Sequence, residues 1–231
     1  MYHSLIISGK NTFTEWGVVP TSRPVVDPPE VKTTYIDLPA SNGVLDYSDL
    51  LLGTIPYSQR KGSWEFAVRP GYSWPTVYSS IMNYLHGQKH TVILEDDPYY
   101  QYTGRLSVNK WKSDENYSLI TIDYDLDPFK QRTTSSDDAD WLWNDLFNLT
   151  IRYGNFSVKG TKYRNFINEG IKVSTPTITC SAAMSVLFGG ETYNLVTGKN
   201  YNMNLSFQPG DNVMKFTGTG TVAVSYREVS L

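Results

Sequence analysis

The stretch from Thr91 to Lys130 constrains the fold most, because runs of about strand length follow one another there. The runs are rich in β-branched and aromatic residues. They are Thr91–Pro98, Tyr99–Arg105, Leu106–Lys112 and Leu119–Lys130, with turn formers at Asp97-Pro98, Thr103-Gly104 and Ser113–Asn116. In the last run every second residue from Ile120 to Leu126 is apolar, so one face is buried and the other is wet. We expect an antiparallel meander in which nothing requires catalysis.

The composition agrees with a mainly β protein. The 231 residues include 17 glycines, 12 prolines and 17 tyrosines, a profile that favours short strands joined by turns. One helix is expected, with Ser73 as its cap, Pro75 in its first turn and Gly87 at its end in the left-handed conformation. Its apolar stripe has helical spacing: Val77, Ile81 and Leu85. This helix should pack across one sheet.

The rest of the first half contains further strands and one irregular stretch. Residues 4–8 are expected to form a first edge strand, and Thr33–Leu38 another. Val18–Pro29 holds Pro20, Pro24, Pro28 and Pro29, which cannot donate ladder hydrogen bonds. So long an irregular stretch in a compact domain suggests contact with a neighbouring chain.

The polar stretch Gln131–Asp140 is the expected domain boundary, which gives an N-terminal domain at 1–130 and a C-terminal domain at 131–231. Trp141–Phe147 is either a helical turn or a cover for the second domain. From Asn155 onward strands recur at the spacing of a sandwich or barrel, and Tyr201–Phe207 has the clearest alternation. The second half is therefore expected to be all-β.

Charge and cysteine content exclude several classes of function. The formal net charge is −3, with 11 basic and 15 acidic residues in 1–130 and 9 and 8 in 131–231. Without a dense Lys/Arg stripe, sequence-specific nucleic-acid binding is disfavoured. No segment approaches the length of a membrane helix or a signal peptide, so the chain is expected to be made soluble in a cytoplasm. Cys180 is the only cysteine and is expected to be a buried hydrophobe rather than a nucleophile.

An acidic cluster offers the strongest candidate for chemistry. Glu95, Asp96 and Asp97 stand near His86 and His90, which suggests a metal site or a hydrolase pair. Neighbouring residues on a strand point to opposite faces, and hard cations need more oxygen ligands than this, so a solvated turn is the preferred interpretation. His86 is expected at the helix C-terminus, where the dipole favours a cation. His3 is isolated in the sequence.

Aromatic residues suggest a further possibility. Tyr99, Tyr100 and Tyr102, or Trp141 and Trp143, could stack on sugar rings, although large aromatics on strands more often belong to a core or an interface. No nucleophile elbow, phosphate loop, dinucleotide fingerprint or zinc-protease motif is present. The sequence therefore assigns no catalytic, cofactor or metal residue, and the partner-binding residues stay unassigned.

Several short segments form a characteristic series along the chain. The first is Leu45–Ser48, placed between Asn42-Gly43 and Tyr57…Arg60, and the helix ending at His86-Gly87 follows. The later ones are Asp96–Tyr100, Gly104-Arg105, Ile122…Asp127–Lys130, Gly210–Asn212, Phe216–Gly220 and Val224–Tyr226. In their order and spacing they resemble the distal tail protein (Dit) family of long-tailed, non-contractile bacteriophages and related prophages. The resemblance spans nearly the whole chain and is least at Val18–Pro29.

The resemblance implies a structural virion protein and not an enzyme. It implies an N-terminal β domain with one helix that closes a hexameric ring, and a C-terminal galectin-like β-sandwich. Such a ring joins the tail tube to the tail-tip hub, with receptor-binding proteins as further partners, and leaves a channel for DNA; heterologous contacts close it. Two other classes stay open. One is a carbohydrate-binding sandwich that recognises bacterial surface glycans, and the other is a hydrolase using Glu95, Asp96 or Asp97.

Overall fold

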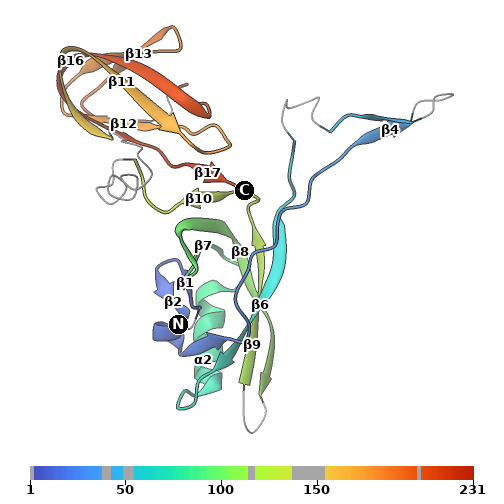
Figure 1. Ribbon diagram of the computed structural model, residues 1–231. Coiled ribbons are helices and arrows are strands. Elements are labelled where there is room, and N and C mark those ends of the chain that lie inside the picture. Colours follow the sequence, from blue (N-terminus) through green and yellow to red (C-terminus); the bar gives the residue numbers. More distant parts are fainter. Residues whose placement is uncertain (1–2, 38–42, 49–54, 114–117, 137–153, 202–203) are drawn as a thin grey trace. The chain divides into compact units, whose positions relative to one another are not determined.

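The computed structural model is mainly β, as expected, and divides into two compact units (Figure 1). It describes residues 3–37, 43–48, 55–113, 118–136, 154–201 and 204–231. Unit 1 comprises Met1–Lys130 together with Leu231, and unit 2 comprises Gln131–Ser230.

Unit 1 is built on an antiparallel sheet with the strand order β2-β1-β7-β8-β9-β6-β3. The strands are β1 (Leu5–Ile7), β2 (Lys10–Asn11), β3 (Val18–Pro20), β6 (Arg60–Val68), β7 (Lys89–Leu94), β8 (Asp97–Ser113) and β9 (Ser118–Leu126). The strand expected at residues 4–8 is present, but it is not the edge, because β2 pairs with its outer side.

The expected meander is β7, β8 and β9, with its turns placed differently. Leu94 pairs with Asp97, so the first turn is Glu95-Asp96 and not Asp97-Pro98. Thr103-Gly104 is no turn either, since β8 runs through it for 17 residues. A Cβ at Gly104 would lie 2.3 Å from the carbonyl oxygen of Asp125. The glycine is there because β9 passes close to it, and sequence alone cannot distinguish that from a turn.

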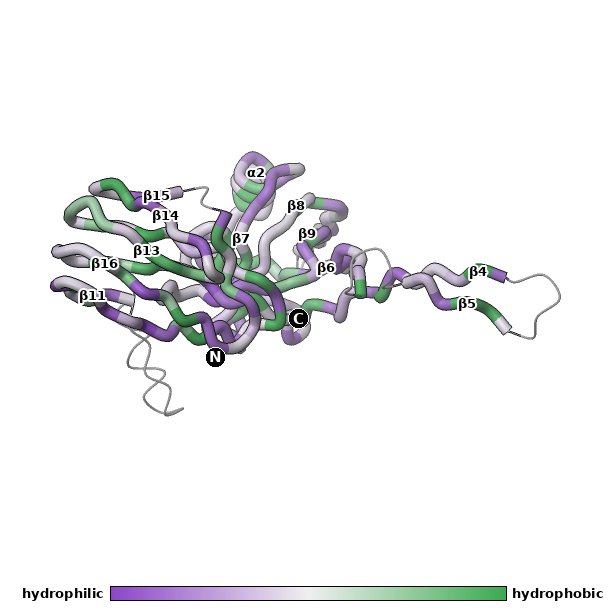
Figure 2. Tube along the Cα trace, turned by 90° about the horizontal axis from the view of Figure 1, so that it is seen from above, coloured by the Kyte–Doolittle hydropathy of each residue, from purple (hydrophilic) through white to green (hydrophobic). Residues whose placement is uncertain are grey.

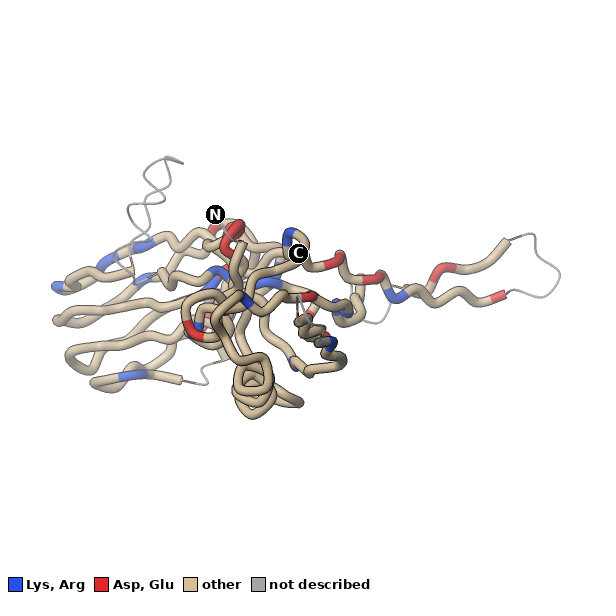
Figure 3. The backbone as a smooth tube through the Cα atoms, turned by 90° about the horizontal axis from the view of Figure 1, so that it is seen from below, with Lys and Arg blue, Asp and Glu red and all other residues tan. Residues whose placement is uncertain are grey.

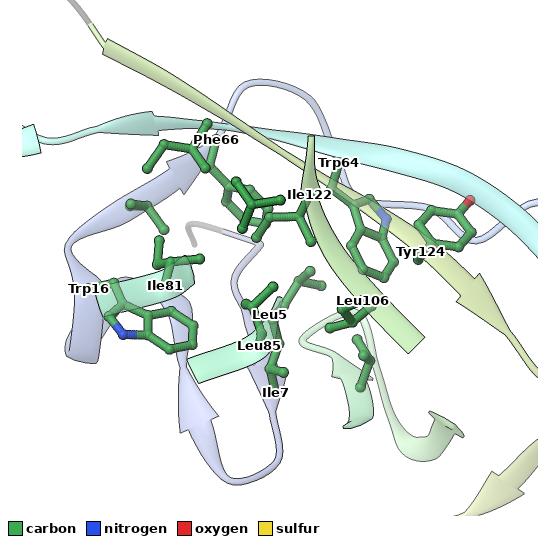
Figure 4. Packing of buried hydrophobic residues seen from close by; sticks show 14 of the residues in the cluster. Leu5, Ile7, Trp16, Trp64, Phe66, Ile81, Leu85, Leu106, Ile122 and Tyr124 are labelled. Atoms are coloured by element: carbon green, nitrogen blue, oxygen red, sulfur yellow. The ribbon is translucent and has the colours of Figure 1, made fainter. Parts of the chain in front are cut away.

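The expected helix is α2 (Trp74–Leu85), and its apolar stripe faces the sheet. Ile81 and Leu85 are fully buried, and Figure 4 shows Leu85 near Leu5 and Ile7 of β1. Gly87 follows the helix with φ +72°, as expected. Ser73 occupies the N-cap position, but its side chain makes no capping hydrogen bond. The core of unit 1 therefore lies between α2 and one face of the sheet.

A second, short helix was not expected. α1 (Thr12–Trp16) has Asn11 as its N-cap, whose side chain accepts hydrogen bonds from the N–H groups of Phe13 (2.8 Å) and Thr14 (3.2 Å). Gly17 ends it with φ +63°. Five residues are too few for an apolar period, and only the caps signal this helix.

Unit 2 contains one curled six-stranded sheet with the order β14-β13-β16-β12-β15, and β11 pairs along the other side of β16. The strands are β11 (Asn155–Asn168), β12 (Thr177–Cys180), β13 (Met184–Phe188), β14 (Glu191–Leu195), β15 (Gly198–Asn200) and β16 (Gly210–Ser225). β10 (Lys130–Arg132) pairs with β17 (Val229–Ser230). The sandwich implied by the resemblance is thus a continuous sheet whose core lies inside its curl.

Two glycines lie beside the connection between β12 and β13. β11 pairs along one side of β16, and β12 and β13 pair with successive parts of its other side, so the chain between them runs beside β16. A Cβ at Gly218 would lie 2.5 Å from Met184 Cβ, and one at Gly220 would lie 2.8 Å from the Ser181 hydroxyl. Glycine is needed where the connection approaches β16 this closely.

The prediction of a strand at Tyr201–Phe207 is wrong. Tyr201, which is 63% exposed, and residues 204–207 are not in a strand, and Asn202 and Met203 lie outside the described residues. Leu205 and Phe207 are buried, and Phe207 bridges Ser174. A loop that places alternate side chains in a core produces the same pattern as a strand. Trp141–Phe147 also lies outside the described residues.

Candidate functional site

A two-stranded ribbon directly precedes β6 in the sequence and extends away from the sheet of unit 1 (Figure 1). We call it the arm, and it comprises residues 31–37, 43–48 and 55–57. It contains β4 (Tyr35–Asp37) and β5 (Val44–Asp46), which pair only with each other in the described part of the chain. At its base the N–H of Lys32 donates to the carbonyl of Pro56 (2.9 Å). The arm includes the strand expected at Thr33–Leu38.

Both strands of the arm carry apolar residues (Figure 2). Ile36 and Leu45 stand opposite each other and are 43% and 44% exposed, and Tyr35 and Val44 are 56% and 55% exposed. An isolated two-stranded ribbon is marginally stable in water, and exposed apolar surface of this kind marks an interaction site. The arm therefore has the properties of a segment that packs on another surface.

The arm and its base are acidic. The sequence places Asp27, Glu30, Asp37 and Asp46 there, with Lys32 as a basic residue among them. Figure 3 shows acidic and basic positions along this part of the trace. The hydroxyl and the N–H of Ser48 bond to Asp46 and hold the pKa of its carboxyl below the usual value, which keeps it ionised. A surface that receives the arm should thus combine apolar and basic groups.

The segment before the arm is held on the sheet by side chains of β6 and β9. The indole N–H of Trp64 donates to the carbonyl of Val25 (2.8 Å), and the Arg60 guanidinium donates to that of Asp27 (2.9 Å). The hydroxyl of Tyr124 accepts from the N–H of Asp27 (3.2 Å). Part of the stretch expected to be irregular is thus β3, and the part after Pro20 is irregular but anchored. We call these three side chains the clamp.

The clamp is buried, although it binds a loop. Arg60 is 6% exposed, and burial lowers the pKa of its guanidinium. Trp64 stacks on Tyr124 with ring centroids 4.3 Å apart. A hollow of about 560 Å³ lies beside the segment, and its lining carries charges of both signs from Asp27, Glu30, Lys32 and Lys61. The arrangement can fix the direction of the arm, and it offers no set of groups for a reaction.

The acidic cluster is a structural turn. Glu95 accepts hydrogen bonds from the N–H (2.6 Å) and the hydroxyl (2.9 Å) of Ser4. Asp96 and Asp97 each bind other partners, Asp97 pairing with the ammonium of Lys130 at 2.9 Å. Because the carboxylates go to different partners, they cannot act as a pair. In the described part of the chain no group of three or more His, Cys, Asp or Glu could hold a metal ion.

Asp96 joins segments that are distant in sequence. Its carboxylate lies 2.9 Å from His3 Nδ1 and 2.7 Å from Arg23 Nε, and these contacts lower the pKa of Asp96. His3 is therefore not isolated. Its partner lies 93 positions away, so no local signal in the sequence could have found the pair.

The other two histidines are also structural. His86 lies at the C-terminal end of α2, as expected, and its Nδ1 accepts a hydrogen bond from the N–H of Val108 (3.1 Å). His90 is 7% exposed, lies against the Tyr84 ring and has Nδ1 3.0 Å from the Ser8 hydroxyl. Burial lowers the pKa of His90. Neither ring approaches the acidic cluster as a catalytic partner would.

The three tyrosines considered for sugar stacking, Tyr99, Tyr100 and Tyr102, do not form a platform. Tyr102 is buried, Tyr100 lies under the Lys130 ammonium (4.4 Å), and only Tyr99 is exposed, at 53%. Trp141 and Trp143 lie outside the described residues. Cys180 is buried, and burial raises the pKa of its thiol, which opposes reactivity. Within the described ranges, none of the helices has the length and apolar character needed to cross a membrane.

The sheet face turned away from α2 is polar and carries paired charges. Lys61 Nζ lies 4.0 Å from Asp125, and Lys89 Nζ lies 3.8 Å from Asp127. Asp125 also stands opposite Arg105 in the ladder between β8 and β9. Alternating signs leave this face without a basic stripe that would retain a polyanion.

The two β units have a fold similar to that of a phage distal tail protein. One solved structure with this fold is that of SPP1 Dit (gp 19.1), described as a paradigm of the hub adsorption apparatus in phages that infect Gram-positive bacteria. It is similar to this chain with a TM-score of 0.62 and 14% sequence identity, and the match covers 100% of each chain. No family model and no curated protein matches the sequence. The mainly β fold with two separate units that was expected from the resemblance is confirmed.

Proposed function

We propose that this protein is the distal tail protein of a phage or prophage, a hexameric ring that joins the tail tube to the tip and host-adsorption proteins. The observation that carries the proposal is the structural match to SPP1 Dit over the full length of both chains, both β units included. A match of one domain alone would support only a shared module.

The arm supports ring formation. A cyclic ring needs a heterologous contact, in which one surface of a subunit meets a different surface of the next. The arm supplies one such surface, because its apolar residues are exposed and its two strands pair only with each other in the described part of the chain. The buried clamp would give every copy the same arm direction, and a closed ring requires this uniformity.

The polar sheet face supports a channel. We assign this face of β6, β8 and β9 to the lumen, since the opposite face is covered by α2. Its paired charges would let DNA pass without being retained. In this function the protein is not an enzyme. Its partners are the tail tube protein, the tail-tip hub and receptor-binding proteins, and its location is the tail tip of the virion.

The test is the mass and shape of the purified protein, measured by light scattering and negative-stain imaging over a range of concentrations. Rings of six subunits with a central hole are the expected result. A strict monomer at the highest concentration, which also fails to bind purified tail tubes, would contradict the proposal.

A second candidate, a carbohydrate-binding module in unit 2, rests on the outer face of its sheet. Tyr163 is 60% exposed and stands opposite Lys215, whose ammonium lies 5.7 Å from its ring centroid. The neighbouring row carries the hydroxyls of Thr161, Thr217 and Ser185. An aromatic ring beside hydroxyls and a cation suits an acidic glycan. Titration calorimetry with cell-wall glycans tests this, and no heat of binding would remove the candidate.

A further inference from the structure

β11 forms one edge of the sheet in unit 2. It is 14 residues long and, in the part of the chain that the structure describes, pairs only with β16. A long edge strand presents a row of backbone groups to which a strand of another molecule can add. Whether the edge can accept another strand depends on which N–H and carbonyl groups of β11 point outward and on what they bind.

The register shows which backbone groups point outward. Thr221 exchanges hydrogen bonds with Ser181, donating to its hydroxyl (2.8 Å) and accepting from its N–H (3.0 Å), so its backbone groups point away from β11. Its partner Ser157 is therefore in a non-hydrogen-bonded pair and points its N–H and carbonyl to the open edge. The register between β11 and β16 is unbroken, and backbone direction alternates with a period of two residues. The N–H and carbonyl of Tyr163 therefore point to the open edge, as those of Ser157 do.

Two cationic side chains of β11 itself donate hydrogen bonds to the outward-pointing carbonyl groups. Lys162 Nζ donates to the carbonyl of Ser157 (2.8 Å), and Arg164 Nη1 donates to that of Tyr163 (3.3 Å). Both side chains point to the inner, half-buried side of the strand, with their charged groups 5.7 and 5.3 Å from the ring centroid of Phe156. The edge thus carries inward-pointing charges at the positions where a neighbouring strand would bind.

We propose that Lys162 and Arg164 close the outer edge of β11 to strand addition. An incoming strand must take over the carbonyls of Ser157 and Tyr163, so it must first displace both cations. The displaced charges would then lie beside an apolar ring and a new backbone, where desolvation is unfavourable. Closing the edge matters more if the proposed function is correct, because a ring brings several copies of unit 2, each with this edge, close together. The two cations act in the single chain as well.

The experiment uses the full chain with the double substitution Lys162→Val and Arg164→Val, which removes the charges and favours strand structure. We expect this variant to associate beyond the mass of the wild type as concentration rises. Hydrogen exchange at the outward amides of Thr161 and Tyr163 should become several-fold slower. Lys162→Arg, which keeps a donor, should behave as wild type. Lys215→Val is the matched control, because Lys215 lies on the adjacent strand but on the sheet face.

A double variant that keeps the wild-type circular dichroism and still has the wild-type mass and exchange at every concentration overturns the proposal. Should the double variant not fold, Lys162→Val alone tests the Ser157 carbonyl by the same exchange measurement. The result does not depend on ring formation, since exchange in β11 reports the edge whether the wild type is a ring or a monomer. If hydrogen exchange in β11 were slowed in Lys215→Val too, the proposal would likewise be overturned, because the slower exchange would then come from the loss of any positive charge and not from opening the edge.

Discussion

His90 shows how one buried side chain makes stability depend on pH. Burial against Tyr84 holds the pKa of His90 below its usual value of about 6.5. The unfolded chain therefore binds more protons than the folded chain at mildly acidic pH. The stabilisation from neutral His90 is complete above about pH 6.5 and is lost as the pH falls toward the lowered pKa of the folded state.

Substituting His90→Gln should therefore flatten the pH dependence of stability. Denaturant midpoints of wild type and variant are compared at pH 7.5 and pH 5, and the wild type should lose more stability than the variant between the two. Equal losses in the two proteins would show that His90 does not control this transition. His3→Gln is the control for the more exposed histidine that pairs with Asp96.

A substitution at Gly104 tests whether the close approach of β9 explains why β8 continues through this position, where a turn was expected. Gly104→Ala would place a methyl group against the backbone of Asp125 and Leu126, so neither neighbour can move aside without shifting the strand. We expect a loss of about 1–3 kcal/mol in the free energy of unfolding, measured by chemical denaturation. Ser107→Ala, on the same strand but on the polar face, should change it little. An unchanged stability in Gly104→Ala would contradict the close approach.

At the scale of elements, the clamp should control the segment that leads to the arm. Trp64→Phe keeps the aromatic ring and removes the donor to the carbonyl of Val25. Leaving that carbonyl without its partner should cost about 1–3 kcal/mol where it stays buried. Hydrogen exchange in residues 25–30 should become faster while that of α2 stays the same. Tyr124→Phe should act on the same segment, and Tyr99→Phe, at an exposed position of the same unit, should not. Uniformly faster exchange across unit 1 would mean general destabilisation and no specific clamp.

The elements that the sequence predicted are those whose pattern is set by one apolar face. α2 and β9 follow from the periods of Ile81 and Ile122, because both residues face the same core. The continuity of β8 was missed because close packing at Gly104 produces the same local signal as a turn. The clamp was missed for a different reason. Its contacts join Val25 to Trp64 and Asp27 to Tyr124, and such long-range pairs leave no periodic signal.

At the scale of the whole molecule, the arm should decide the oligomeric state. Ile36→Ser together with Leu45→Ser removes the apolar pair that faces outward from the arm, and both residues are exposed in the single chain. The substitution should therefore leave the fold of each unit unchanged. Because the same residues would be buried in a ring, we expect the mass in solution to fall from that of a hexamer to that of a single chain.

Ile171→Ser with Val173→Ser is the matched control for this change. It removes the same kind of side chain at positions of unit 2 that are 52% and 48% exposed, and it should leave the ring intact. A ring subunit gains stability from association, so the thermal midpoint of the wild type and of the control should rise with protein concentration, and that of the arm variant should not. If the arm variant still forms rings, closure depends on another surface. The clamp and the lumen face would then have to be tested in its place, because both could retain their roles without the arm.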